Sequence, residues 1–336
     1  MTAQAQQPSP ALFFETITAY QRSEAVKSAI ELDLFTAIGE GNHTASAIAV
    51  RCDASERGAR ILCDYLTMIG FLTKEGNSYG LTQDSAVFLD RRSPAYMGGA
   101  IEFILSDLIL EGFKHLSEAV RKGGNTENSS LSPEHPVWVK FARAMAPMMR
   151  PTAQAIAQLI DPEANRKLKV LDIAASHGLF GLAFATRNPQ AEIVGLDWAN
   201  VLEVSKENAK AAGVADRHST IAGSAFEVDY GTGYDVVLLT NFLHHFDPPT
   251  NEKLLRKVHA ALAEGGRAVT LEFVPNEDRI SPQSTAGFSL TMLAGTPSGD
   301  AYTFAELEGM FRNAGFAKSE FHEIPPALQP LIVSHK

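Results

Sequence analysis

One short stretch of the sequence combines small residues with aspartates in a way that suits a nucleoside ligand. Asp172 stands near the end of an apolar run, and Ala-Ala-Ser-His-Gly follows at 174–178. Small side chains at a strand-to-helix turn let a ligand approach backbone N–H groups at the helix N-terminus. Asp197, nineteen residues after Gly178, ends a second apolar run, where a carboxylate can accept hydrogen bonds from ribose hydroxyls. The pattern indicates an adenosine-containing cofactor, although the full G-x-G-x-x-G motif is absent.

Alternating strand and helix patterns place these aspartates in the C-terminal half of the chain. The expected strands are 169–174, 191–196, 218–222, 234–240 and 267–274. The expected helices between them are 179–187, 201–212 and 251–262. This alternation is typical of an α/β fold with a parallel, doubly wound sheet, in which ligands bind outside the carboxyl ends of the strands.

The N-terminal part follows the order of a winged helix-turn-helix. Helical periodicity over 10–38 precedes a short helix at 45–51 capped by Thr44, a third helix from Asp53 or Ser55 to about residue 69, and a hairpin over 71–82. Such modules often bind DNA. Residues 1–95, however, contain eight basic and eleven acidic side chains, a net charge of −3. Because binding to duplex DNA depends on neutralising phosphates, a dimerisation or scaffolding role is favoured.

The composition is that of an ordinary globular protein. Its 336 residues predict about two domains at roughly 150 residues each. The presence of only two cysteines, Cys52 and Cys63, favours a reducing compartment and therefore a cytoplasmic location. A net charge of −10 disfavours nucleic acid as a partner, and no apolar run approaches the roughly 20 residues that span a bilayer. The polar N-terminus lacks the features of a secretory signal.

A stripe of aromatic and methionine side chains runs along the helical segment before the sheet. It contains Trp138, Phe141, Met145 and Met148. Packing in a core is the simplest interpretation, and the lining of an apolar pocket is the alternative. The ten histidines show no zinc-ligand spacing, so no metal site is expected.

The segment after the fourth expected strand carries a resemblance to a known family. Residues 241–248 read Asn-Phe-Leu-His-His-Phe-Asp-Pro, and Val-Leu-Asp at 170–172, Thr-Leu-Glu at 270–272 and Tyr-Thr at 302–303 lie in the same order as in that family. The C-terminal portion resembles class I S-adenosylmethionine-dependent methyltransferases. Over roughly residues 15–336 the chain is similar to small-molecule O-methyltransferases, which include the caffeate and acetylserotonin enzymes and many bacterial relatives.

This resemblance implies a domain organisation and partners. Residues 1–95 would form a winged-helix-like dimerisation domain that makes a homodimer and does not bind nucleic acid. Residues 96–336 would form the methyltransferase domain, with linking, substrate-side helices over 96–160 and a Rossmann-like fold over 165–336. S-adenosylmethionine would be the cofactor, S-adenosylhomocysteine the product, and no metal would take part.

The resemblance also implies site residues. His244 would be the general base and Glu272 the carboxylate that orients it. The implied cofactor-binding residues are Asp172, Ala174, Ser176, Gly178, Asp197, Trp198, Ser224, Ala225, Phe226 and Asn241. The implied pocket for a flat, apolar, hydroxylated substrate contains Trp138, Phe141, Met145, Met148, Phe288, Met292 and Leu293.

The chemistry of methyl transfer supports a histidine base. The displacement at the sulfonium is in line, so positioning supplies much of the rate. A phenol of pKa near 10 lies within reach of an imidazole of pKa about 6.5, especially when a carboxylate stabilises the imidazolium. His245, next in the chain, is expected to point elsewhere as a loop or surface histidine.

Departures from the family pattern keep alternatives open. Ser224 stands where the family has an acid beside the adenine, and Ala301 stands where a second catalytic carboxylate is expected, with Asp300 as the neighbouring candidate. C- or N-methylation on the same scaffold therefore remains an alternative. A second alternative is a non-catalytic regulator that senses a ligand and binds DNA.

Overall fold

The computed structural model describes residues 7–125, 134–325 and 327–336. The chain divides into two compact units, Met1–Ile101 and Glu102–Lys336, so the boundary falls within helix α7, Ile101–Ile104. The sequence places this boundary a few residues earlier, near residue 95. Among the described residues, no helix is long and apolar enough to cross a membrane.

The first unit is helical apart from one antiparallel hairpin. Its helices are α1 (Ala11–Ile17), α2 (Tyr20–Glu31), α3 (Leu34–Gly39), α4 (Ala45–Arg51), α5 (Glu56–Met68), α6 (Gln83–Phe88) and a 3-10 turn at Gly98–Ala100. Strands β1 (Leu72–Glu75) and β2 (Ser78–Leu81) form the hairpin. Thr44 caps α4 by accepting the backbone N–H of Ala47, as the sequence predicts, and Ser55, one of the two predicted starts, caps α5 by accepting that of Gly58.

The core of this unit forms where α2, α3, α4 and α5 meet the hairpin. Phe35, Ile48 and Leu66 are fully enclosed there. Cys63 lies in the same cluster and Cys52 packs against it, and both are free thiols. Burial raises the pKa of the Cys63 thiol to about 12, so this cysteine acts as a small apolar core residue.

The second unit is built on a seven-stranded sheet. The strands are β3 (Leu168–Ile173), β4 (Ala191–Asp197), β5 (His218–Ala222), β6 (Tyr234–Thr240), β7 (Leu262–Leu271), β8 (Lys318–His322) and β9 (Leu331–His335), in the spatial order β5-β4-β3-β6-β7-β9-β8. The first five are parallel, as the sequence predicts. Strands β8 and β9 add an antiparallel edge that the sequence prediction did not contain.

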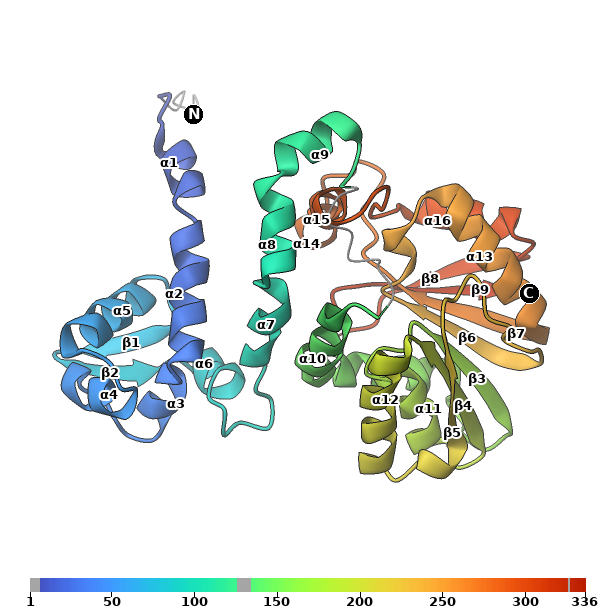
Figure 1. Ribbon diagram of the computed structural model, residues 1–336, viewed down its shortest axis with the longest axis horizontal. Helices are drawn as coiled ribbons and strands as arrows, with labels where there is room; N and C mark the ends of the chain where they lie inside the picture. The colour runs from blue at the N-terminus through green and yellow to red at the C-terminus, as the bar shows by residue number, and fades with distance from the viewer. Residues whose placement is uncertain (1–6, 126–133, 326) are drawn as a thin grey trace, which may run out of the picture. The chain divides into compact units, whose positions relative to one another are not determined.

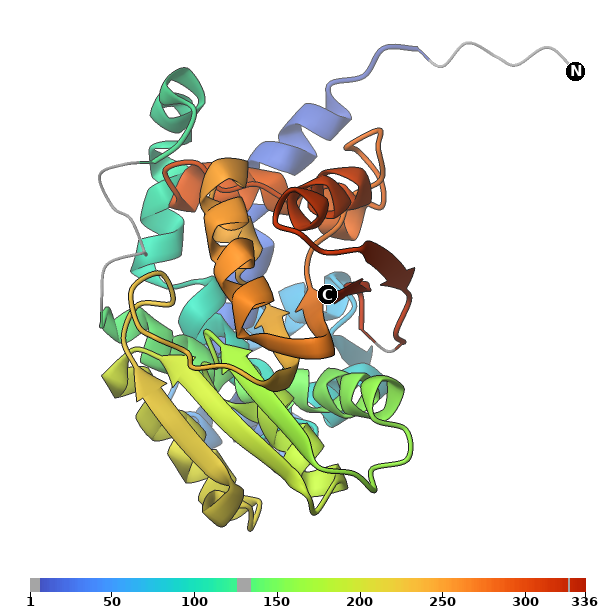
Figure 2. The same cartoon turned by 90° about the vertical axis from the view of Figure 1, so that its right-hand side faces the viewer.

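Helices cover both faces of this sheet (Figures 1 and 2). Those of the second unit, after α7, are α8 (Asp107–Lys114), α9 (Leu116–Lys122), α10 (Pro136–Ile160), α11 (Leu179–Arg187), α12 (Ala199–Ala211), α13 (Pro248–Ala261), α14 (Gln283–Ala286), α15 (Phe288–Gly295) and α16 (Phe304–Asn313). One apolar cluster joins α10 and α11 to one face, and the other joins α13 and α16 to the opposite face. In a doubly wound sheet this double cover explains why the central parallel strands β3 and β6 are mostly apolar and buried.

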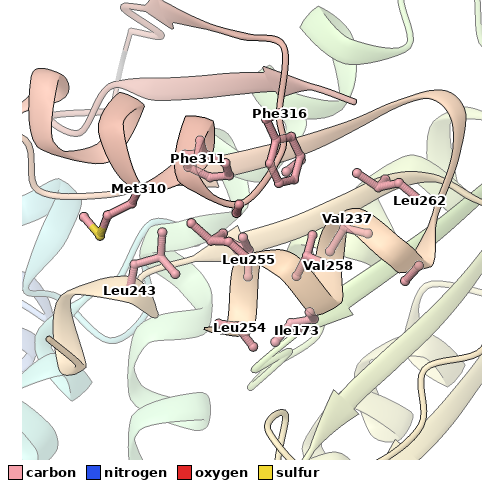
Figure 3. Packing of buried hydrophobic residues seen from close by; sticks show 14 of the residues in the cluster. Ile173, Val237, Leu243, Leu254, Leu255, Val258, Leu262, Met310, Phe311 and Phe316 are labelled. Carbon is pink, nitrogen blue, oxygen red and sulfur yellow. The ribbon is translucent and has the colours of Figure 1, made fainter. Parts of the chain in front are cut away.

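Figure 3 shows the cluster under α13 and α16. Leu255 and Val258 of α13 meet Val237 of β6, while Phe311 comes from α16. All four side chains are fully enclosed. This packing fixes β6 and α13, the elements that flank the segment containing His244.

We expect Leu255→Ala to lower the free energy of unfolding by about 2–5 kcal/mol, since it removes buried methyl groups and leaves a cavity. Urea titration measures this loss. Leu328→Ala, at a leucine that is 78% exposed, is the matched control and should change the free energy by less than about 0.5 kcal/mol. Equal effects at the two leucines would contradict the assignment of Leu255 to the core.

Candidate active site

A cavity of about 840 Å³ opens at the carboxyl ends of β3, β4 and β6. Residues of α7, α8, α10 and α15 complete its wall. A space of this size and apolar lining is typical of a small-molecule site, and its position is the one expected for a doubly wound sheet.

The turn after β3 has an unusual backbone. Ala174, Ser176 and Gly178 all have positive φ, of 54°, 52° and 73°. Asp172 stabilises the following helix because its Oδ2 accepts the Gly181 backbone N–H at 2.9 Å. Burial raises the pKa of Asp172 to about 7. Ala174 and Ser176 line the cavity, whereas Asp172 and Gly178, expected as cofactor contacts, lie behind the turn and shape it.

Asp197 connects the ends of β3 and β4. Its Oδ2 accepts the Ser176 backbone N–H at 2.8 Å, and its Oδ1 accepts the Trp198 backbone N–H at 2.7 Å. Burial raises the pKa of Asp197 to about 6, although these two N–H donors act in the opposite direction. Ser176 Oγ is buried without a hydrogen-bond partner among the described residues. Asp197, Ser176 and Trp198 therefore form one polar corner of the cavity.

The loop after β5 forms the neighbouring wall. Gly223, Ser224, Ala225 and Phe226 all line the cavity, as the sequence predicts for this loop. The Phe226 ring packs edge to face on Phe246, with ring centroids 4.9 Å apart. Ser224 Oγ accepts the Phe226 backbone N–H at 3.3 Å, so the hydroxyl holds the loop's own backbone.

Asn241 continues this wall at the end of β6. It has a positive φ of 55° and lines the cavity. Its side-chain oxygen accepts a hydrogen bond from Gln329 Nε2. Gln329 was not predicted from the sequence, because it comes from the segment before β9 and reaches the cavity only through the tertiary fold.

His244 and Glu272 form a buried pair between β6 and β7. His244 Nδ1 lies 2.6 Å from Glu272 Oε2, while Glu272 Oε1 accepts the backbone N–H groups of Phe242 and Leu243, each at 2.8 Å. A carboxylate at Nδ1 fixes the ring and the tautomer that carries its proton there. The other nitrogen, Nε2, is then an acceptor, and His244 lines the cavity.

His245 also lines the cavity, so the expectation that it points elsewhere is wrong. Its ring lies 4.3 Å from the His244 ring and 5.6 Å from Trp138, measured between centroids. The expectation assumed the alternating side chains of a strand. Leu243–His245 is instead a 3-10 turn, in which successive side chains rotate by about 120° and two neighbours can face one cavity.

Aromatic and methionine side chains line the rest of the space. The expected residues Trp138, Phe141, Met145, Phe288 and Met292 are among them, whereas Met148 and Leu293 are not. Met149 takes the place of Met148 because the stripe on α10 continues from Met145 with a spacing of four residues. The sequence analysis missed a second set, Phe103, Ile104, Leu105, Ile109, Leu110 and Phe113.

His177, in the turn after β3, and Asp300, the neighbour of Ala301, differ in location. His177 is buried and lines the cavity, its Nδ1 accepts the Leu179 backbone N–H, and burial lowers its pKa to about 4. Asp300 instead lies 3.4 Å from Arg279 in an ion pair and is not among the residues that line the cavity. In the part of the chain that the structure describes, no group of three His, Cys, Asp or Glu residues could hold a metal.

Family models match both units of the chain. Residues 113–317 match an O-methyltransferase domain and residues 14–91 an O-methyltransferase dimerisation domain. The chain belongs to the O-methyltransferase family, and it is an S-adenosylmethionine-dependent enzyme.

Individual relatives extend over nearly the whole chain. The 3-hydroxy-5-methyl-1-naphthoate 3-O-methyltransferase of Streptomyces sahachiroi is 28% identical, covering 91% of this chain and 89% of the relative. The crystal structure of a candidate O-methyltransferase from Nostoc punctiforme is 60% identical, with a TM-score of 0.95 over 98% of this chain and 100% of that one. Human N-acetylserotonin methyltransferase in complex with S-adenosylmethionine shares the fold at 21% identity, with a TM-score of 0.85 over 100% and 99% of the two chains.

Gly178→Ala should destabilise the protein more than Gly213→Ala. Both glycines have positive φ, which costs a residue with a Cβ about 1–2 kcal/mol, but only at Gly178 would the new Cβ clash with Ser205, 2.2 Å from its Oγ and 3.0 Å from its Cβ. Urea titration of both variants measures the difference. Gly213 has open space at this position, so equal losses would contradict the close packing behind the turn.

Proposed function

We propose that the protein transfers a methyl group to a hydroxyl of a flat, largely apolar, aromatic small molecule, with His244 as the general base. The observation that carries this proposal is the His244–Glu272 pair, which lies in the wall of a cavity lined by aromatic side chains. The name of the Streptomyces sahachiroi relative describes methylation of a hydroxyl on a naphthalene ring that also carries a carboxylate, so it supports the flat aromatic frame and the hydroxyl of this acceptor class.

The polar corner of the cavity suits the cofactor. Among the described residues Ser176 Oγ has no hydrogen-bond partner, and the small Ala174 leaves the turn backbone accessible. We assign Asp197 to the ribose hydroxyls because a carboxylate accepts two hydrogen bonds from a diol. Trp198 and the 223–226 loop would enclose the adenine, with Ser224 as a weaker partner than an acid. When bound, S-adenosylmethionine supplies a methyl group on a positively charged sulfur.

The residues of the chain itself supply proton transfer and positioning. Glu272 holds Nδ1 of His244, so that Nε2 can accept the proton of the substrate hydroxyl and Glu272 stabilises the imidazolium that forms. Phe288 packs edge to face on the His244 ring, with ring centroids 4.9 Å apart, and stacks on Phe273, with centroids 3.8 Å apart. These contacts restrict the imidazole and offer a flat apolar surface to an aromatic ring.

The first unit suits a homodimer. Helix α1 has no buried residue, and Phe13, Phe14 and Tyr20 are more than half exposed. Exposed aromatic side chains of this kind often mark an interface. Together with the match to a dimerisation domain over residues 14–91, they support pairing of two copies through this unit.

His244→Ala should reduce kcat with a phenolic acceptor by about 10²–10⁴-fold, the usual contribution of a general base. The affinity of this variant for S-adenosylhomocysteine should stay within about twofold of the wild-type value, because the assigned cofactor contacts lie elsewhere. A labelled-methyl assay and calorimetry measure the two quantities. His322→Ala, at a histidine on the edge strand β8, is the control, and full turnover by His244→Ala would exclude His244 as the base.

Affinity for S-adenosylhomocysteine should fall about tenfold between pH 7.5 and pH 5. The pKa of Asp197 is raised to about 6, so the carboxylate that accepts the ribose hydrogen bonds is present above this pH and is lost as the pH falls through it. Calorimetry at several pH values measures the dependence. Asp197→Asn should bind weakly at every pH, and a variant with wild-type affinity and pH dependence would refute the assignment.

A further inference from the structure

His245 is a second imidazole in the wall of the cavity, and its Nδ1 has no hydrogen-bond partner among the residues that the structure describes. Nδ1 is enclosed by protein, and His245 is among the residues that line the cavity. The ring edge available to a ligand is therefore the one that contains Nε2. His244 differs because Glu272 already occupies its Nδ1.

The surroundings of His245 determine what this edge offers. Burial, and to a lesser extent the adjacent His244, hold the pKa of His245 well below its usual value. The ring is thus neutral, with one N–H and one lone pair. Since enclosing an unpaired N–H is rarer in proteins than enclosing an unpaired acceptor, the tautomer with hydrogen on Nε2 is favoured. His245 then presents a donor to the cavity beside the acceptor Nε2 of His244.

The charges of the lining add a second constraint. Of the described residues that line the cavity, none is Lys or Arg. The ionisable side chains there are the carboxyl groups of Asp197 and Glu227 and the imidazoles of His177, His244 and His245. An anionic group on the acceptor would lose water without gaining a cationic partner among these side chains. The lining therefore selects against acids.

We propose, on the basis of the proposed function, that the acceptor is uncharged and carries a hydrogen-bond-accepting oxygen next to the reacting hydroxyl. His244 would take the hydroxyl proton, and His245 would donate to the neighbouring oxygen. The 4.3 Å between the two imidazole centroids suits two adjacent substituents of one aromatic ring. Trp138, edge to face with His245, holds the second imidazole in place.

Three naphthalenes that differ at one position test this inference: 2-naphthol, methyl 3-hydroxy-2-naphthoate and 3-hydroxy-2-naphthoic acid. Calorimetry with the full-length enzyme loaded with S-adenosylhomocysteine at pH 7.5 gives their affinities. We expect the ester to bind about tenfold more tightly than 2-naphthol, the gain of one hydrogen bond, and more tightly than the acid by at least as much. The same three compounds are then assayed as methyl acceptors.

Variants at His245 assign the preference to that side chain. His245→Leu should reduce the ester's advantage over 2-naphthol to less than about threefold, measured as the ratio of the two affinities in that same variant. His245→Asn, which keeps an N–H donor, should retain part of the advantage. An undiminished ester preference in His245→Leu, or wild-type binding that favours the acid, would overturn the inference. The expected binding pattern without any turnover would support it and count against the proposed function, which separates the two failures.

Discussion

The site depends on one buried carboxylate, that of Glu272. It lies just after β7 and holds three donors of the neighbouring segment, the backbone N–H groups of Phe242 and Leu243 and Nδ1 of His244. Removing a buried acceptor leaves its donors without a hydrogen bond, and each unpaired buried donor costs about 1–3 kcal/mol of stability. Glu272 therefore does more than orient a ring: it fixes the path of the backbone that carries His244 and His245 to the cavity.

The sheet makes this interaction possible. Thr240 of β6 is in register with Leu271 of β7, and the Asn241 N–H donates to the Leu271 carbonyl, so Glu272 falls beside the turn that contains His244. The packing of α13 on these strands holds that register through side chains such as Leu255. The chemistry thus follows from parallel strands that end together at one edge.

The sequence patterns correctly predicted those parts of the fold that depend on residues close together in the chain. The apolar runs gave the parallel strands, and Thr44 and Ser55 gave helix starts, because burial and capping depend on nearby residues. Strands β8 and β9 were missed because β8 is a mostly polar edge strand whose partner, β9, is defined only by the finished sheet. Strand β9 itself is a short, buried, mostly apolar segment between β7 and β8, and its antiparallel pairing on both sides depends on the assembled sheet.

The candidate site was predicted in the same uneven way. Asp197 and His244 lie at strand ends, which a sequence can locate, and the structure places both in the cavity. His245 was misplaced because a 3-10 turn, not a strand, carries it. Phe103 and Gln329 reach the cavity from distant segments. The apolar run over residues 100–110 was the one signal in the sequence that could have indicated Phe103.

The tautomer of the His244 imidazole, that is, which ring nitrogen carries the proton, tests the central claim directly. Nitrogen NMR of ¹⁵N-histidine-labelled protein, with the His244 signal assigned by His244→Gln, reports which ring nitrogen carries the proton. Glu272 at 2.6 Å from Nδ1 predicts the neutral tautomer protonated at Nδ1, with Nε2 as an acceptor toward the cavity, and loss of that preference in Glu272→Gln. A His244 protonated at Nε2 in the wild-type protein would contradict the account.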